Sequence, residues 1–525
     1  MRVLSVGVAI LLAGSGSGSG SARADTPDLE PIEREVRALI RVYDENASNQ
    51  DAAHRRRRRA VAHRLGALPT PTSRKQLLRI VKDDPGPRVR IAAMTALGTI
   101  ADLDAMKKLL TLVVRSDEEL LGSTFAGAVA RCADPEAARW LALQLPRIRD
   151  AGVRLAVVEA LGSLRVREAE PALLALEVGP RALGSPALRY ECLRALGRIG
   201  GRTACRVLLL AARSKQKARR LAAAEMLLTC ERDERTLAAM RVLLGDPDVL
   251  VHEQAARSVG EARLMELVPE LIALLENGRL RVKHEAQKSL RAITGRDLGY
   301  VPETWRQWWK ARSEGRLDAA GNLADGSGFS VPKYYDFKVF SDRLLFVVDV
   351  SESMKIGDGR VTRIDVAGRQ LLKTIGELRE PTQFNVITFA GSPNFWEKGL
   401  KPATETHRRR AARWVSKQLL PRGGTNTYDT LLRALHENPE LDTLYLLSDG
   451  LPTAGKATVP EQILARVRDL NRLRRVRIHT IALLLGAPPD EERGGVGETA
   501  DMTDFMRRLA EQNGGTFIEI RSAPP

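Results

Sequence analysis

Several residue types are scarce in this chain of 525 residues, and each shortage excludes a class of protein. Aromatic residues make up only 4%, which disfavours an aromatic-rich β-sandwich and favours helices packed through small and aliphatic side chains. The four cysteines contain no C-x-x-C pair, so their spacing indicates neither a zinc site nor a dense disulfide framework. One or two disulfides are compatible with it. The cysteines are Cys132, Cys192, Cys205 and Cys230.

Long apolar runs are also lacking, because no segment approaches the roughly 20 residues that a membrane-spanning helix needs. The apolar stretch from Val3 to Ala13 follows Arg2 and precedes the sequence Ala22-Arg23-Ala24. This order is typical of a cleavable secretory signal, with cleavage after Ala24. We therefore expect a secreted or periplasmic protein with no membrane span. An accidentally apolar, unstructured N-terminus is the alternative.

Histidine is rare as well, with seven residues and no H-E-x-x-H pair, so the usual zinc-protease motif is absent. Basic residues are in excess, 82 against 65 acidic ones, mainly before residue 340. A basic surface attracts nucleic acid or other anionic polymers, but an arginine-rich proteome gives the same balance without such a partner. The densest runs, Arg55 to Arg59 and Arg213 to Arg220, lack interleaved aromatics, so solvated helix faces explain them better than a nucleic-acid site.

A ten-residue pattern recurs between about residues 30 and 300, at intervals of about 32 residues. Its small or aliphatic positions fall on one helical face, and a glycine at the tenth position is expected to stop each helix. Such hairpins must stack to bury that face, which predicts an all-α superhelical solenoid with a concave binding surface. The clearest copies are Val89 to Gly98, Val153 to Gly162, Leu188 to Gly197 and Val251 to Gly260.

These copies resemble the HEAT-repeat family, especially its short bacterial form, over about half of the chain. Cys192 occupies a position that is alanine or valine in other copies, which predicts a buried structural thiol. Trp305, Trp308 and Trp309 share one helical face, and we expect them to cover the exposed core of the last repeat. A ligand-binding aromatic patch is the alternative.

After a segment rich in glycine and serine, the periodicity changes to short apolar runs separated by helical stretches. This alternation predicts an α/β domain with a doubly wound, mostly parallel sheet. The expected strands are Leu344 to Val348, Phe384 to Phe389, Leu444 to Leu447, Ile478 to Leu485 and Thr516 to Ile520. The expected domains are a signal peptide (1–24), a HEAT-like solenoid (30–312), a linker (313–340) and the α/β domain (341–525).

Oxygen donors follow the ends of the expected strands, where doubly wound sheets place their binding crevice. Asp349 to Ser353 gives a D-x-S-x-S run, Gly423 to Thr427 gives glycines with a hydroxyl, and Asp449 precedes Gly450. Two carboxylates and three hydroxyls suit Mg²⁺, or the similarly hard Mn²⁺ and Ca²⁺, better than zinc or copper. Helix capping and a common turn are the alternative explanations of each motif taken singly.

Residues 341–525 resemble a von Willebrand factor type A domain with a metal-ion-dependent adhesion site. The resemblance assigns the metal to the side chains of five residues, Asp349, Ser351, Ser353, Thr425 and Asp449. Glu352 departs from the family pattern, which often has glycine there, and its carboxylate either points to solvent or competes for the metal. We read Asp429 as an early-helix acid and leave it out of the site.

The sequence thus predicts a non-catalytic adhesion or scaffold protein in which the bound cation bridges to a Glu or Asp carboxylate of a protein partner. The helical array is expected to supply a second interaction surface. Two alternatives stay open. One is a metal-dependent hydrolase whose repeats present substrate, and the other is binding of an anionic polymer by the basic solenoid.

Overall fold

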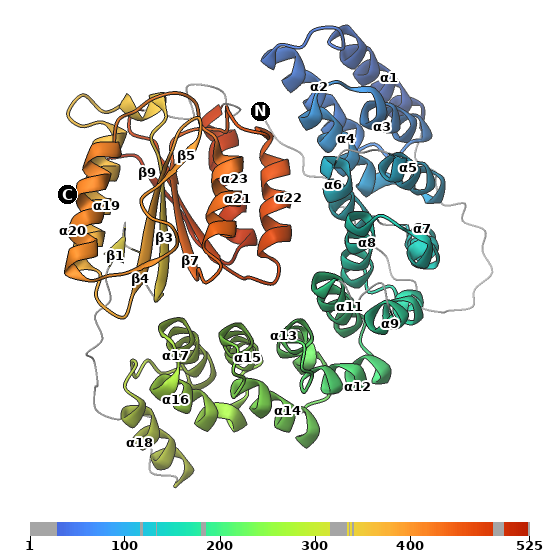
Figure 1. Ribbon diagram of the computed structural model, residues 1–525. Helices are drawn as coiled ribbons and strands as arrows, with labels where there is room; N and C mark the ends of the chain where they lie inside the picture. The colour runs from blue at the N-terminus through green and yellow to red at the C-terminus, as the bar shows by residue number, and fades with distance from the viewer. Residues whose placement is uncertain are drawn as a thin grey trace.

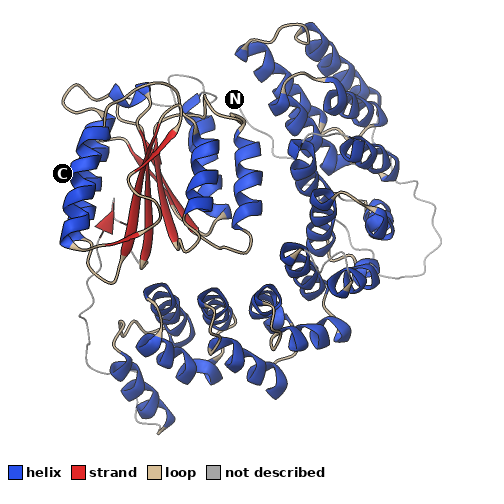
Figure 2. Ribbon diagram, viewed as in Figure 1, coloured by secondary structure: helices blue, strands red, loops and turns tan. Residues whose placement is uncertain are grey.

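The computed structural model describes residues 29–115, 119–132, 134–179, 185–314, 333–334, 337–338, 341–486 and 498–522. An all-helical array forms an arc, and an α/β domain lies on the concave side of that arc (Figure 1). The two parts differ in secondary structure, because the long strands all belong to the α/β domain (Figure 2). The expected signal peptide lies outside the described residues, as does most of the expected linker.

The array has two layers of helices, as the solenoid prediction requires. Each inner helix packs on the inner helix of the next repeat. The inner helices are α2 (Ala52–Leu65), α4 (Pro87–Ile100), α6 (Glu119–Val129), α8 (Ala151–Ser163), α11 (Pro186–Ile199), α13 (Lys217–Met226), α15 (Val249–Glu261) and α17 (Leu280–Thr294). The outer helices are α1 (Leu29–Glu45), α3 (Pro71–Asp83), α5 (Leu103–Arg115), α7 (Pro135–Gln144), α9 (Glu170–Val178), α12 (Arg202–Ala211), α14 (Glu234–Leu244), α16 (Val268–Asn277) and α18 (Pro302–Ser313).

In the four clearest copies the recurring glycine does not stop the inner helix, so that expectation is wrong for them, whereas Gly66 in a weaker copy does cap the end of α2. Helix α4 continues past Gly98 to Ile100, and α11 continues past Gly197 to Ile199. A Cβ on Gly98 would lie 2.3 Å from the carbonyl oxygen of Ala128 on α6. The glycine is therefore selected because neighbouring inner helices approach each other closely at this point.

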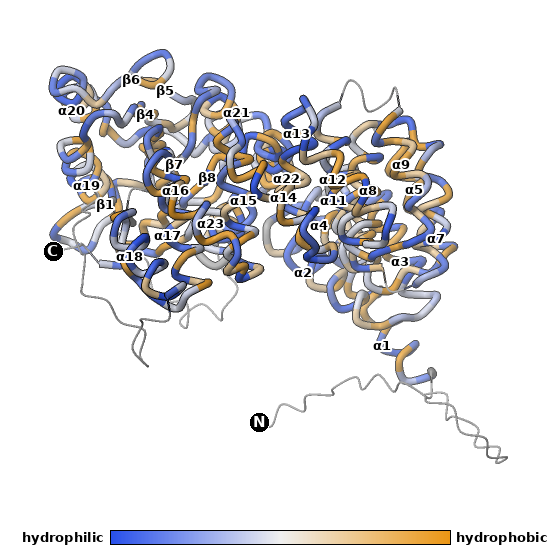
Figure 3. Tube along the Cα trace, turned by 90° about the horizontal axis from the view of Figure 1, so that it is seen from below, coloured by the Kyte–Doolittle hydropathy of each residue, from blue (hydrophilic) through white to orange (hydrophobic). Residues whose placement is uncertain are grey.

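Aliphatic side chains fill the array between its layers, and Figure 3 shows hydrophobic and hydrophilic residues alternating along its helices. The thiol of Cys192 is buried and unpaired, while Cys205 and Cys230 form a disulfide. Trp305 and Trp308 of α18 are buried against the last repeat, which confirms their role as a cover. Among the described residues, no helix has the length and apolarity that a membrane crossing demands.

The sheet of the α/β domain has the order β5-β4-β3-β7-β8-β9. Its long strands pair in parallel, as expected. The short antiparallel strands β5 and β6, which the sequence pattern did not predict, lie at one edge. The strands are β3 (Arg343–Asp349), β4 (Gln383–Phe389), β5 (Pro393–Phe395), β6 (Lys401–Pro402), β7 (Thr443–Ser448), β8 (Arg477–Leu483) and β9 (Phe517–Ile520), besides a hairpin of β1 (Lys333–Tyr334) and β2 (Phe337–Lys338).

Helices cover both faces of this sheet (Figure 1). Alternate residues of β3 face opposite layers, since Phe346 packs with α19 and α20 while Val347 packs with the helices on the other side. Because β3 and β7 pair in parallel, their carboxyl ends lie at the same edge of the sheet, between the hydrophobic cores on its two faces. The helices are α19 (Arg363–Glu377), α20 (Glu405–Gln418), α21 (Thr427–Glu437), α22 (Pro460–Asn471) and α23 (Glu498–Gln512).

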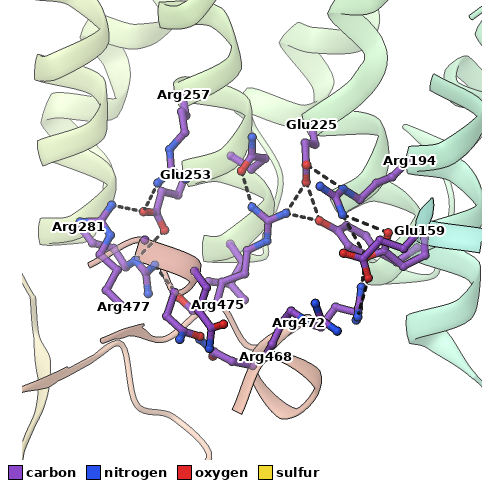
Figure 4. Close-up of a pocket in the computed structure, with 18 residues that line it drawn as sticks. Glu159, Arg194, Glu225, Glu253, Arg257, Arg281, Arg468, Arg472, Arg475 and Arg477 are labelled. Carbon is purple, nitrogen blue, oxygen red and sulfur yellow. Dashed lines mark hydrogen bonds and ion pairs between the residues drawn. The ribbon is translucent and has the colours of Figure 1, made fainter. Parts of the chain in front are cut away.

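Ion pairs fasten the opposite, amino-terminal edge of the sheet to the array (Figure 4). The arginines belong to the turn after α22 and to the start of β8, and the glutamates line the concave side with one from each successive inner helix from α8 to α17. The pairs are Arg472 with Glu159 and Glu191, Arg475 with Glu225, and Arg477 with Glu253 and Glu285. The concave surface thus binds the chain's own α/β domain.

Candidate metal centre

The five expected metal ligands lie on three loops at the carboxyl edge of the sheet. Asp349 is the last residue of β3, and Asp449 directly follows β7, the parallel neighbour of β3. Ser353 lies in the short 3-10 helix η5 (Glu352–Lys355), just after Ser351. Thr425 precedes α21, whose N-cap is Asn426. Strand pairing therefore brings together residues that are 100 positions apart in the chain.

Asp349 lies at the bottom of this site and is fully buried. One carboxylate oxygen accepts the backbone N–H of Ser351 at 2.8 Å, and the other accepts the hydroxyl of Ser448 at 2.5 Å. Burial, and secondarily the charge of Asp449, raises the pKa of Asp349 to about 7, against the effect of these hydrogen bonds. Among the described residues no basic side chain pairs with Asp349, so a cation bound here would meet an uncompensated carboxylate.

The hydroxyls of the site point toward one place. Ser351 Oγ lies 3.2 Å from Ser353 Oγ, and the Ser353 hydroxyl donates to Asp449 Oδ1 at 2.8 Å. A Cβ built on Gly450 would lie 4.0 Å from both Ser353 Oγ and Thr425 Oγ1. The first and second loops therefore present hydroxyls on the same side of the third.

The second loop is tied to the residues that follow Asp449. The backbone N–H of Thr425 donates to Thr453 Oγ1 at 2.8 Å, and its carbonyl accepts the N–H groups of Thr453 and Ala454. Within the described part of the chain, the Thr425 hydroxyl itself has no protein partner. It is held in place by its backbone and is available to a ligand.

Arg363, which the sequence analysis missed, is a further member of the site. It is buried at the start of α19, where it donates to Asp449 Oδ2 at 2.7 Å and, through Nε, to the carbonyl of Leu485 at 2.9 Å. An arginine that begins a helix is ordinarily a surface residue, so nothing in its sequence neighbourhood signals this contact. The ion pair turns Oδ1 of Asp449 toward Ser353 and neutralises part of the site's negative charge.

Two acidic residues near the site have other partners. The Glu352 side chain is 60% exposed and pairs with Lys355. Of the two orientations considered for Glu352, the structure shows the one directed to solvent. Asp429 accepts the Asn426 side-chain amide at 3.0 Å and the Lys456 N–H at 3.2 Å.

The arrangement suits a hard divalent cation. Carboxylate and hydroxyl oxygens are the donors that Mg²⁺, Mn²⁺ and Ca²⁺ prefer. The carboxylate of buried Asp349 would supply negative charge to such a cation. Among the described residues, no group of three or more His, Cys, Asp and Glu side chains is arranged to hold a metal ion. The donor set therefore depends on its hydroxyls, unlike the nitrogen and sulfur ligands typical of zinc sites.

Comparison with known proteins assigns families to two parts of the chain. Residues 342–517 match the profile of the von Willebrand factor type A domain, and residues 48–126 match the profile of HEAT repeats. The chain is therefore a helical-repeat array followed by an α/β domain of the von Willebrand factor type A kind, in agreement with the expected fold class.

Individual relatives match only part of the chain. The inter-alpha-trypsin inhibitor heavy chain H2 of Mus musculus is 31% identical over 224 residues, which are 39% of this chain and 21% of that protein. The von Willebrand factor A domain-containing protein 3A of Homo sapiens is 32% identical over 134 residues, which are 26% of this chain and 10% of that protein. This chain thus spans about a fifth or less of the length of these relatives.

Solved structures resemble it more distantly. A von Willebrand factor type A protein from Catenulispora acidiphila is 20% identical, covers 34% of this chain and 38% of its own, and gives a TM-score of 0.28. The match to the RO (RSR) protein of Deinococcus radiodurans is 15% identical, covers 94% of this chain and 96% of that one, and gives a TM-score of 0.22.

Proposed function

We propose that this is an exported, non-catalytic binding protein whose type A domain holds a divalent cation that bridges to a Glu or Asp carboxylate of a protein partner. The cation, Mg²⁺ or the similar Mn²⁺ or Ca²⁺, would be held by Asp349, Ser351, Ser353, Thr425 and Asp449. The observation that carries the proposal is the convergence of hydroxyls from two loops beside Gly450, next to both carboxylates.

The charges of the site favour an external carboxylate. The two aspartates carry at most two negative charges, and Arg363 compensates part of the charge on Asp449. The remaining donors are neutral hydroxyls, so a divalent cation bound here keeps a net attraction for an anion. A carboxylate oxygen is itself a hard donor, and a partner's Glu or Asp side chain would complete the coordination.

The helical array contributes by fixing the position of the type A domain. Its concave glutamates pair with arginines at the amino-terminal edge of the sheet (Figure 4). The candidate metal site lies at the opposite, carboxyl edge. We therefore assign the concave side of helices α8 to α17 to the domain of the same chain, and a second surface for a partner must lie elsewhere on the array.

Titration calorimetry of Mg²⁺ and Mn²⁺ into the chelator-treated mature protein tests the metal site. Saturable binding is expected, and a Ser353→Ala, Thr425→Ala variant should bind at least tenfold more weakly because it loses two donors. A Ser163→Ala, Ser416→Ala variant removes two exposed hydroxyls far from the site and should bind like the wild type. Equal affinity in the two variants, or no binding by the folded wild type, would refute the assignment.

A labelled decapeptide with one aspartate in a Gly-Ser background tests the bridge. We expect its fluorescence anisotropy to rise with the protein and Mn²⁺, and to fall back when EDTA is added. A peptide with asparagine at that position is the matched control. Metal-independent binding, or equal binding of both peptides, would contradict a bridging cation.

A further inference from the structure

A basic cleft separates the first repeats from the type A domain. Two adjoining cavities, of about 430 and about 720 Å³, lie between helices α2 and α4 on one side and α22, α23 and the loop after β7 on the other. Both are lined by Arg56, Arg59, Arg88 and Asp501, so they form one continuous cleft, which is called the arginine cleft below.

The run Arg55 to Arg59 divides into residues with different roles. Arg58 is fully buried, pairs with Asp84 at 2.9 Å and donates to the carbonyls of Asn46 and Asn49, so it stabilises the first repeats. Arg56 lines the arginine cleft, whereas exposed Arg57 lines neither cavity. The run is thus more than a solvated helix face, because one side of it faces the type A domain.

Positive charge in the arginine cleft is only partly compensated. Arg59 reaches across to Asp501 of α23 at 3.5 Å. Among the described residues, Arg56 and Arg88 form no ion pair with a carboxylate. Elsewhere between the two domains the arginines are matched by concave glutamates, so these two cations are exceptional for an interdomain surface.

The arginine cleft begins beside the metal site. Leu451 and Pro452, which line the smaller cavity, are the second and third residues after Asp449. The next residue, Thr453, is hydrogen-bonded to the backbone of Thr425. At 3.8 Å between consecutive Cα atoms, the cleft wall starts within about 10 Å of the metal loop, a distance that about three extended residues span.

We propose that the partner is an acidic polypeptide segment that binds both places at once. One carboxylate would reach the cation, and further Glu or Asp residues, from about three positions along the segment, would pair with Arg56 and Arg88. This inference rests on the proposed function, since the metal site receives the first carboxylate. It adds the class of partner and the direction in which the segment runs.

The lining of the arginine cleft favours a polypeptide over a nucleic acid. Leu451, Pro452 and Val459 give it an apolar wall, which suits the side chains of a polypeptide better than a phosphate backbone. Phe505 also lines it but is only 1% exposed, so it offers no surface for stacking bases.

Two labelled decapeptides test the proposal on the full mature chain. The first has one aspartate in a Gly-Ser background, and the second has four glutamates beginning three residues after that aspartate. With Mn²⁺ present, the second should bind at least tenfold more tightly. An Arg56→Ala, Arg88→Ala variant should lose this advantage and still bind the first peptide normally.

The matched control is an Arg57→Ala, Arg206→Ala variant, which removes the same charge from exposed positions outside the cleft and should keep the advantage. If the Arg56→Ala, Arg88→Ala variant keeps it as well, the inference is wrong while the proposed function stands. If EDTA leaves the binding of both peptides unchanged, the proposed function itself fails. Tighter binding of a ten-residue oligothymidylate, lost in the same variant, would overturn the choice of a polypeptide.

Discussion

Replacing Glu225 and Glu253 by glutamine is expected to release the type A domain from the concave side of the array. Glu225 pairs with Arg475, and Glu253 pairs with Arg477 (Figure 4). Glutamine keeps the size of each side chain but removes its charge. The substitution therefore weakens the contact between the domains while leaving the packing of α13 and α15 in place.

The pKa values of the two carboxyls set the expected magnitude. Burial alone would raise the pKa of Glu253, but the guanidinium groups of Arg281, Arg477 and Arg257 lower it to about 2. At Glu225, burial likewise raises the pKa, but the charges of Arg475 and Arg194 outweigh it and lower the pKa to about 2. Relative to the ordinary value of 4.5, each carboxylate is stabilised by about 3 kcal/mol.

Only part of that free energy links the domains, because each glutamate also pairs with arginines of the array. Assigning roughly half to the arginine of the type A domain gives about 1 to 2 kcal/mol for each site and about 3 kcal/mol for both. The undocked population should therefore rise about 100-fold.

Trypsin reports this opening because Arg475 can enter the protease only when it leaves Glu225 and Tyr190. Cleavage after Arg475, followed by mass spectrometry, should be about 100-fold faster in the Glu225→Gln, Glu253→Gln variant. A Glu231→Gln, Glu266→Gln variant, altered at two exposed positions, should behave like the wild type. An unchanged rate after Arg475, or equal acceleration at every site, would show that these pairs do not hold the domains together.

Three further results are expected. Docking should weaken as the pH falls from 4.5 toward 2, because the pKa values of Glu225 and Glu253 are lowered in the folded protein and their stabilisation is complete only above 4.5. The radius of gyration from small-angle X-ray scattering should grow over that window, and a constant radius would count against the interface. The Arg363→Met variant should bind Mg²⁺ at least tenfold more tightly in calorimetry, because Asp449 regains its full charge. The free energy of unfolding of this variant should be lower by about 3 kcal/mol, because a buried ion pair has lost one partner. Weaker Mg²⁺ binding would contradict this view of Arg363. Gly98→Ala should destabilise the array by about 1 to 3 kcal/mol in urea unfolding, because the added Cβ meets the Ala128 carbonyl. Gly376→Ala is the control, because a Cβ at that position meets open space and should not destabilise the protein. Equal effects would refute the close-packing argument.

The sequence predicts much of the site because its ligands follow strand ends. Asp349 directly follows the apolar run Leu344 to Val348, and Asp449 follows the run Leu444 to Leu447 after a single serine. The carboxyl ends of these parallel strands meet at one edge. Such a prediction needs only local patterns and the order of elements. The short strands β5 and β6 were missed because two or three residues carry no recognisable alternation.

Periodicity determined the class of each domain, since it records which face of a helix or strand is buried. It could not show why the tenth position of the clearest copies is glycine, because the close contact between Gly98 and Ala128 involves two different helices. Nor could periodicity predict that Arg363 pairs with Asp449, 86 residues away, or that Arg472 pairs with Glu159, 313 residues away. Only the tertiary structure decides these pairs, because the charge of a side chain is visible in the sequence but the charge that it meets depends on how the whole chain folds.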